Sequence, residues 1–219
     1  KENATPIKQA AVKCDLVIFG EPEQSCMERL LTGHPCGKFV TQLPTSFLWA
    51  RQPRYPIQNI LLILRLEETD DATLEWGGHL AKTSGATITI LPIVPSLPVM
   101  YSLGNRIQTG LDMLLSSNTP AGQHLRRLAQ RMAGWQVNSD LHLRQGEPAL
   151  QMQEEVAEGA YDLIVIGAEP HGRLHRLLLG ELVKPMLHWV ERPLLIARSI
   201  HSDTLKFGKN EIPKNLSTT

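Results

Sequence analysis

The sequence lacks the features that would commit it to a membrane or to nucleic acid. No apolar run approaches the roughly 20 residues needed to cross a bilayer. The chain holds 22 Lys and Arg against 22 Asp and Glu, so its formal net charge is zero. A neutral chain with only 5% aromatic residues gives no general argument for binding nucleic acid or an anionic lipid surface. We therefore expect neither kind of partner for this segment.

Cysteine is also scarce. Cys14, Cys26 and Cys36 are the three cysteines, and their spacing matches neither a zinc ribbon nor a redox pair. An odd number of thiols without a pairing pattern predicts free, mostly buried cysteines in a reducing compartment. We accordingly expect a cytoplasmic location.

Catalytic and metal-binding motifs are missing as well. The eight histidines show no metal-ligand spacing, and no Gly-x-Ser-x-Gly nucleophile elbow occurs. The segment Gly33–Lys38 is one residue short of a phosphate loop and is followed by phenylalanine. The sequence therefore predicts no metal site and no enzymatic activity.

The most informative stretch runs from Tyr161 to Arg198. Its apolar run Leu163–Ile166 is short, rich in β-branched residues and ended by Gly167, which predicts a strand buried on both faces. A glycine-bearing loop, a helix to about Val190 and a second buried strand at Pro193–Ala197 follow. This order is a βαβ unit with a ligand-type loop after its first strand.

Part of this stretch has a counterpart near the amino terminus. A shift of 147 residues places Ala10–Arg51 on Ala157–Arg198 without a gap, with eleven identities in 42 positions. Composition alone would give roughly two or three identities. The identities fall on strand starts, glycines and an apolar helix face, so the overlay predicts a partial domain duplication.

The spacings in these segments point to a known family. Gly167 is followed after thirteen positions by Gly180 and then by a strand ending Ile196-Ala-Arg198. Together with Gly146-Glu-Pro148 before a helix and Ala81–Ala86 before a strand, these features resemble the universal stress protein domain over residues 57–198. The resemblance implies an α/β fold with an open parallel five-stranded sheet, strand order 3-2-1-4-5 and helices on both faces, as in the adenine nucleotide alpha hydrolase-like proteins.

The resemblance also implies a domain organisation. Residues 1–51 are expected to be the C-terminal part of a first repeat, residues 52–200 a complete domain, and residues 201–219 a polar flexible tail. Because members of the family commonly pair through their last strands, we expect Thr45–Arg51 to lie beside Pro193–Ser199. A partial repeat at the start of the chain suggests a longer or processed parent protein.

Local signals predict the helices of the larger domain. Helices are expected from Thr69 or Asp70 to about Ser84, with Trp76 lining a seam, and from Thr119-Pro120 to about Ala133. A third is expected from Glu147-Pro148 to about Gly159. Between the last two helices, the alternation of Val137, Leu141 and Leu143 predicts a half-buried strand. Residues 95–117 read as a surface excursion with buried anchors, a flap over the strand ends, or a helix used in oligomer contacts.

The resemblance locates a candidate nucleotide site and also casts doubt on it. Family members that bind ATP hold it at the carboxyl ends of strands one and four, with an aspartate, a glycine-rich loop and a hydroxyl. Gly167 and Gly180 match that pattern, and Gly172 lies in the same loop. The sequence departs from the pattern at three positions, where Arg65 replaces the aspartate, Pro170 the second glycine and Glu181 the hydroxyl residue. The candidate crevice consists of six residues: Arg65, Gly167, Pro170, Gly172, Gly180 and Glu181.

Several interpretations remain open at this point. Arg65 and Glu181 could pair and fill the crevice, or both could be solvated charges. The basic loop of His171, Arg173, His175 and Arg176 could hold a phosphate, or simply face solvent. The favoured function is an interaction or regulatory module with a degenerate ATP site and no expected cofactor. The alternatives are an adenine-nucleotide sensor that binds ATP or AMP through a variant loop, and the cytoplasmic tail of a membrane transporter.

Overall fold

A central sheet with helices on both faces organises the chain. The computed structural model of the 219-residue chain describes residues 9–20, 40, 43–66, 70–94, 115–145, 147–168 and 182–198. The strands are β1 (Leu16–Gly20), β2 (Ser46–Ala50), β3 (Asn59–Leu64), β4 (Thr87–Val94), β5 (Ser139–Leu141), β6 (Arg144–Gln145), β7 (Leu163–Gly167) and β8 (Leu194–Ala197). The helices are α4 (Asp70–Ser84), α6 (Pro120–Trp135), α7 (Pro148–Glu158) and α9 (Val183–Trp189).

The strand order confirms the predicted topology. The path through the sheet is β1-β2-β8-β7-β3-β4-β5, and β6 pairs with β4 off this path. Within the larger domain, β5, β4, β3, β7 and β8 are all parallel, which is the order 3-2-1-4-5. The sheet does not stop at five strands, however, because β2 adds antiparallel to β8 and β1 adds parallel to β2.

The predicted neighbouring segments do lie side by side. Phe47 pairs with Ile196, Leu48 with Leu195 and Trp49 with Leu194 across the β2–β8 junction. The Oγ of Ser46 accepts a hydrogen bond from the backbone N–H of Arg198 at 3.1 Å. Phe47 and Trp49 of β2 therefore share one hydrophobic core with residues of β7, β8 and α9.

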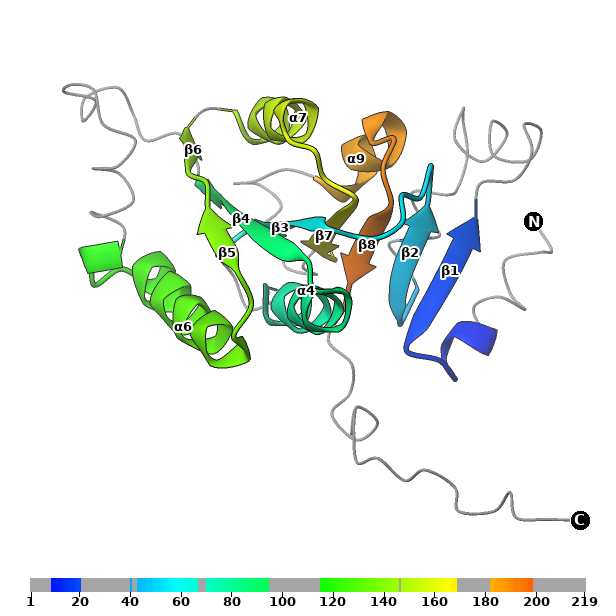
Figure 1. Cartoon of the computed structure of the whole chain (residues 1–219), viewed down its shortest axis with the longest axis horizontal. Helices are drawn as coiled ribbons and strands as arrows, with labels where there is room; N and C mark the ends of the chain where they lie inside the picture. Colours follow the sequence, from blue (N-terminus) through cyan, green and yellow to red (C-terminus); the bar gives the residue numbers. More distant parts are fainter. Residues whose placement is uncertain are drawn as a thin grey trace, which may run out of the picture.

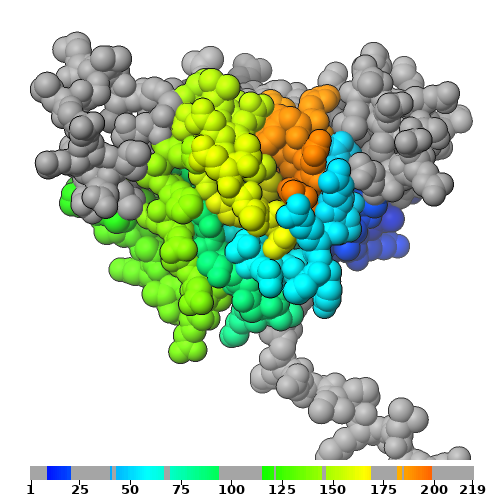
Figure 2. Space-filling model, turned by 45° about the horizontal axis from the view of Figure 1, so that its top comes forward, coloured from blue at the N-terminus to red at the C-terminus, as the bar shows by residue number. Residues whose placement is uncertain are grey.

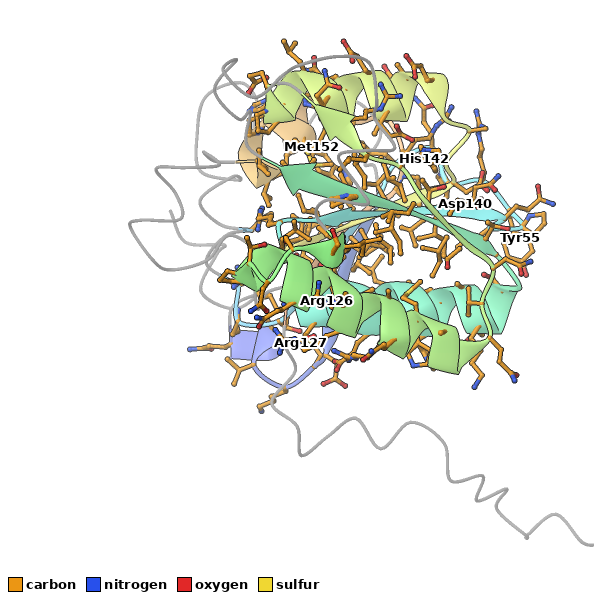
Figure 3. The ribbon with its side chains drawn as sticks, turned by 90° about the vertical axis from the view of Figure 1, so that its left-hand side faces the viewer. Tyr55, Arg126, Arg127, Asp140, His142 and Met152 are labelled. Carbon is orange, nitrogen blue, oxygen red and sulfur yellow. The ribbon has the colours of Figure 1, made fainter. Side chains whose placement is uncertain are left out.

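Two hydrophobic layers sandwich the sheet (Figures 1 and 3). Helices α7 and α9 cover one face, where Met152 is fully buried and points from α7 into the core. Helices α4 and α6 cover the other, where they bury Leu74, Leu128 and Met132. The first face appears in Figure 2, with α7 in yellow-green, α9 in orange and the cyan segment that holds β2 beside blue β1.

The helix ends follow the local sequence signals. The Thr119 side chain caps α6 by accepting a hydrogen bond from the backbone N–H of Gly122, and Pro120 occupies the first turn. The Glu147 carboxylate accepts hydrogen bonds from the first backbone N–H groups of α7, which begins at Pro148. Both helices therefore start where the sequence predicts.

Helix α4 approaches its neighbours closely because two glycines lie in its middle. A Cβ added at Gly77 would lie 2.3 Å from the Leu62 side chain of β3. One added at Gly78 would lie 1.9 Å from the Trp135 ring of α6. These contacts leave no space for a methyl group, so Gly77 allows α4 to lie close to the sheet and Gly78 allows it to lie close to α6.

Two expectations are corrected. Cys14 is exposed rather than buried, because it follows the helical turn that ends near Ala11. The alternation of Val137, Leu141 and Leu143 predicts one half-buried strand, but the segment forms the separate short strands β5 and β6. The expectations for Cys26, Cys36, most of residues 95–117 and the tail lie outside the described residues.

Candidate functional site

The carboxyl ends of β3 and β7 meet at Arg65. This residue directly follows β3, and its side chain is buried, with a residue exposure of 4%. Its Nη1 donates hydrogen bonds of 3.0 Å to the carbonyl oxygens of Gly167 and Ala168. The guanidinium thus lies across the end of β7, at the crevice that the strand order creates.

A buried carboxylate organises the other side of this site. The Oδ1 atom of Asp70, the first residue of α4, accepts a 2.9 Å hydrogen bond from the backbone N–H of Arg65. Between them Leu66 has φ +59°, a left-handed conformation that turns the chain sharply at the strand end. The turn brings the start of α4 back against the end of β3.

His124 joins the same cluster from α6. Its Nε2 lies 3.4 Å from Oδ2 of Asp70, and both side chains are almost fully buried. Its Nδ1 lies 3.1 Å from Nη2 of Arg127. The crevice therefore presents a cation, a carboxylate and an imidazole from three different elements, here called the Arg65 cluster: Arg65, Asp70 and His124.

The structure brings together two of the residues predicted for the site. Arg65 and Gly167 are in direct contact. Pro170, Gly172, Gly180 and Glu181 lie outside the described residues, so the proposed Arg65–Glu181 pair stays a prediction. Across the described ranges, no group of three or more His, Cys, Asp or Glu side chains is placed to hold a metal ion.

Sequence reasoning missed Asp70 and His124 as site residues. Asp70 carries the signal of a helix start, which accounts for its place in the chain but not for its contact with Arg65. His124 lies four positions before Leu128 on the apolar face of α6, and that spacing marks it as a buried histidine. Its contact with Asp70 depends on how α6 packs against α4.

A second polar cluster lies under α7. The Glu155 carboxylate is buried and accepts hydrogen bonds from the Tyr161 hydroxyl and from Nε of Arg144, and His142 Nδ1 lies 2.8 Å from it. Figure 3 shows His142 on the sheet side of α7. Arg144 also pairs with Glu158 one turn along the helix. These contacts tie α7 to the β5–β6 edge of the sheet.

The charges of this cluster shift one another's pKa values. Burial alone would raise the pKa of Glu155, but hydrogen bonds from Tyr161, His142 and Arg144 outweigh it and hold that pKa below its ordinary 4.5. Burial and the hydrogen bond to Glu155 raise the pKa of the Tyr161 phenol. Burial lowers the pKa of Arg144, but its bonds to Glu158 and Glu155 raise it above the usual value. All three groups therefore keep their ordinary neutral-pH charge states.

Sequence comparison identifies the family. The profile of the universal stress protein family matches residues 56–198, which is most of the chain. This chain belongs to the universal stress protein family. A search of curated proteins finds no match to it.

Solved universal stress proteins share the fold at low sequence identity. One from Archaeoglobus fulgidus is 13% identical with a TM-score of 0.60, and 88% of this chain covers 64% of it. A putative universal stress protein from Pseudomonas aeruginosa is 14% identical with a TM-score of 0.59, and 90% of this chain covers 68% of it. A universal stress protein solved in complex with cAMP is 18% identical with a TM-score of 0.45, and the match covers 64% of this chain and 95% of that protein. This universal stress protein thus spans about two thirds of the two longer structures.

Within this universal stress protein, the described helices include none long and apolar enough to cross a membrane. Arg65 follows the carboxyl end of β3 and contacts Gly167 at the end of β7. These are the two strand ends between which the resemblance predicts a nucleotide.

Proposed function

We propose that this universal stress protein is an interaction or regulatory module whose nucleotide crevice is degenerate. The observation that carries the proposal is the contact of the buried Arg65 guanidinium with the carbonyls of Gly167 and Ala168. A guanidinium has donors and no acceptor, so it cannot take the place of the carboxylate that the resemblance implies there. Its side chain also fills the strand end that a ligand would need.

A tandem origin of the amino-terminal segment supports the same proposal. The 147-residue offset relates β1 and β2 to β7 and β8, and it also preserves their register: Val17 pairs with Phe47 as Ile164 pairs with Leu194. Leu48 and Leu195, which the offset relates, pair with each other across the antiparallel junction. A local twofold axis between related units produces this kind of self-complementary pairing.

Side chains crossing the junction have the same approximate symmetry. Nη1 of Arg51 donates a 2.7 Å hydrogen bond to the carbonyl of Val190, just after α9. Arg198, the counterpart of Arg51, reaches in the opposite direction to the carbonyl of Val40 at 3.5 Å, close to Leu43, which is the counterpart of Val190. We infer that the β2–β8 junction reproduces within one chain the association through last strands that the resemblance implies, which leaves other surfaces for protein partners.

A second function, adenine-nucleotide sensing, rests on the charge of Arg65. A cation next to Gly167 would attract a phosphate if the guanidinium could leave the two carbonyls. This candidate requires the crevice to open, whereas the degenerate site requires it to stay filled.

Calorimetric titration of the full chain with ATP and magnesium, and separately with AMP and cAMP, distinguishes the two. We expect no saturable binding in the micromolar range by folded protein. The Arg65→Asp variant restores a carboxylate, and Arg54→Asp, at an exposed position, is its control. Binding gained only by Arg65→Asp would identify Arg65 as the cause of the loss. Micromolar binding by the unmodified chain, abolished in Arg65→Asp, would overturn the proposal and establish the sensor.

A further inference from the structure

An apolar pocket of about 150 Å³ lies on the α4 face of the sheet, toward the amino ends of β7 and β8. Four leucines from four strands form its floor: Leu16 of β1, Leu48 of β2, Leu195 of β8 and Leu163 of β7. Trp76 and Leu80 of α4 form a wall on one side. The pocket is thus separate from the Arg65 cluster, which lies at the carboxyl end of β3.

The floor of this pocket is symmetric, but its walls are not. The 147-residue offset relates Leu16 to Leu163 and Leu48 to Leu195, and the local twofold axis passes between the last two. Rotation about that axis would place a counterpart of α4 on the β1 side. Among the described residues that line the pocket, only Trp76 and Leu80 come from a helix, and that helix is α4.

Strand β1 shows the same asymmetry. Its counterpart β7 lies between β3 and β8 and is buried at all five positions. Strand β1 pairs with β2 alone among the described strands, and Ile18 is 61% exposed while its counterpart Val165 is 0% exposed. Ile18 lies on the α4 face, two residues from Leu16. A strand edge that no second described strand covers, next to an exposed apolar side chain, favours pairing with another chain segment.

We propose that this surface, defined as the edge of β1 that faces away from β2, Ile18 and the open side of the pocket, docks a strand–helix unit built like Asn59–Ser84. The strand of that unit runs parallel to β1, as β3 runs parallel to β7. Its helix is amphipathic and supplies the second wall with large apolar side chains spaced four residues apart, as Trp76 and Leu80 supply the first. The inference rests on the proposed repeat relationship between the two strand pairs.

The kind of segment that would dock follows from the packing on the β7 side, where β3 and α4 cover the counterparts of the β1 edge and of Ile18. A single added strand would pair the edge of β1 but would leave Ile18 in water, because Ile18 points to the face and not to the edge. A lone helix would cover Ile18 but would leave the backbone groups of the β1 edge without strand partners. A strand followed by a helix satisfies both, and a parallel connection of this kind packs back on one face of the sheet.

The test uses the full 219-residue chain and a fluorescently labelled polypeptide of residues 52–84 of the same sequence, which carries one such unit. Anisotropy titration should show saturable one-to-one binding. Ile18→Asp should weaken it at least tenfold, whereas Leu150→Asp, at a 56% exposed position on α7, should leave it unchanged. Ile18→Thr, a milder change, should weaken binding less. A polypeptide carrying Trp76→Ser and Leu80→Ser should bind at least tenfold more weakly, because it cannot build the second wall.

Each other outcome overturns the inference. Absence of binding does so directly, and equal binding by the Ile18→Asp chain would show that the polypeptide exchanges with the chain's own β3–α4. A dimer seen by analytical ultracentrifugation and abolished by Ile18→Asp would make a second copy the occupant instead. None of these results bears on the nucleotide titrations, which probe the opposite ends of the strands, so the two proposals fail separately.

Discussion

Nη1 of Arg65 donates a 3.0 Å hydrogen bond to the carbonyl oxygen of Gly167, and this bond joins the carboxyl ends of the two central strands β3 and β7. The same nitrogen reaches the carbonyl of Ala168. The buried Arg65 side chain therefore links the ends of the two strands through backbone carbonyls.

Replacing Arg65 by methionine should destabilise the fold. The variant keeps an apolar stem of similar length but leaves the carbonyls of Gly167 and Ala168 without this donor. Buried acceptors that lose a charged donor cost about 2–3 kcal/mol of unfolding free energy. Urea unfolding measures the loss, and Arg54→Met at an exposed position should change stability by less than about 0.5 kcal/mol. Equal stability of the two variants would show that the Arg65 contacts contribute nothing.

The Glu155 cluster should make stability depend on pH in the acid range. Its folded pKa lies below the ordinary 4.5 because hydrogen bonds from Tyr161, His142 and Arg144 outweigh the effect of burial. The unfolded chain therefore binds a proton more readily, so this contribution is complete above the ordinary value and is lost as pH falls through the folded value.

Glu155→Gln should remove that dependence. The variant should be about 1–3 kcal/mol less stable than the parent near neutral pH, because the amide loses the charged hydrogen bonds. The difference should shrink as pH falls below 4.5, which urea unfolding at a series of pH values measures. Glu154→Gln, at a half-exposed carboxylate on the same helix, is the control and should change little. A difference that stays constant with pH would contradict the assignment.

Local signals predicted where several elements begin or end, whereas the strand order was predicted from the resemblance to the family. Helix α7 begins at Pro148 because Glu147 caps it and proline suits the first turn, and both features are visible in the chain. The apolar run of β7 likewise ends at Gly167 as expected. The prediction of one strand after Val137 was wrong because pairing with β4, rather than the alternation of side chains, determines where β5 ends. The backbone N–H of His142 still donates to the carbonyl of Ile90, and the pairing of β5 with β4 ends there.

The candidate site was predicted only in outline. The resemblance to the family located Arg65 and Gly167, because its motif assigns them to the ends of strands one and four. The sequence could not show that Arg65 would bond to backbone carbonyls. Every residue has a carbonyl, so the order of side chains does not indicate which carbonyls a buried arginine will reach. The contact between Asp70 and His124 depends on the packing of α4 against α6, which the close approach at Gly78 controls.

Substitutions at Gly78, which is in close contact with Trp135, and at Gly134, which faces open space, test the packing of α4 against α6. Gly78→Ala would place a methyl group 1.9 Å from the Trp135 ring and should destabilise the protein by about 1–3 kcal/mol. Gly134→Ala in α6 is the matched control, because a Cβ there meets nothing within 4 Å. It should stabilise the helix by about 0.5–1 kcal/mol. Thermal unfolding separates the two, and equal effects would mean that α4 can move away from α6 at no cost.

Asp162 should hold the amino ends of β3 and β7 in register. Its Oδ2 accepts backbone hydrogen bonds from Gln58 at 2.9 Å and Asn59 at 3.0 Å, and its own N–H donates to the carbonyl of Asn59. Asp162→Ala leaves two partly buried backbone donors without the carboxylate, which should cost about 1–2 kcal/mol. Asp162→Asn keeps one acceptor oxygen and should lose roughly half as much. Hydrogen exchange at Asn59 provides the specific readout, because its amide should exchange faster in Asp162→Ala while the amides of α6 do not. Uniform acceleration across the sheet and α6 would indicate a global loss of stability and would contradict a local anchoring role for Asp162.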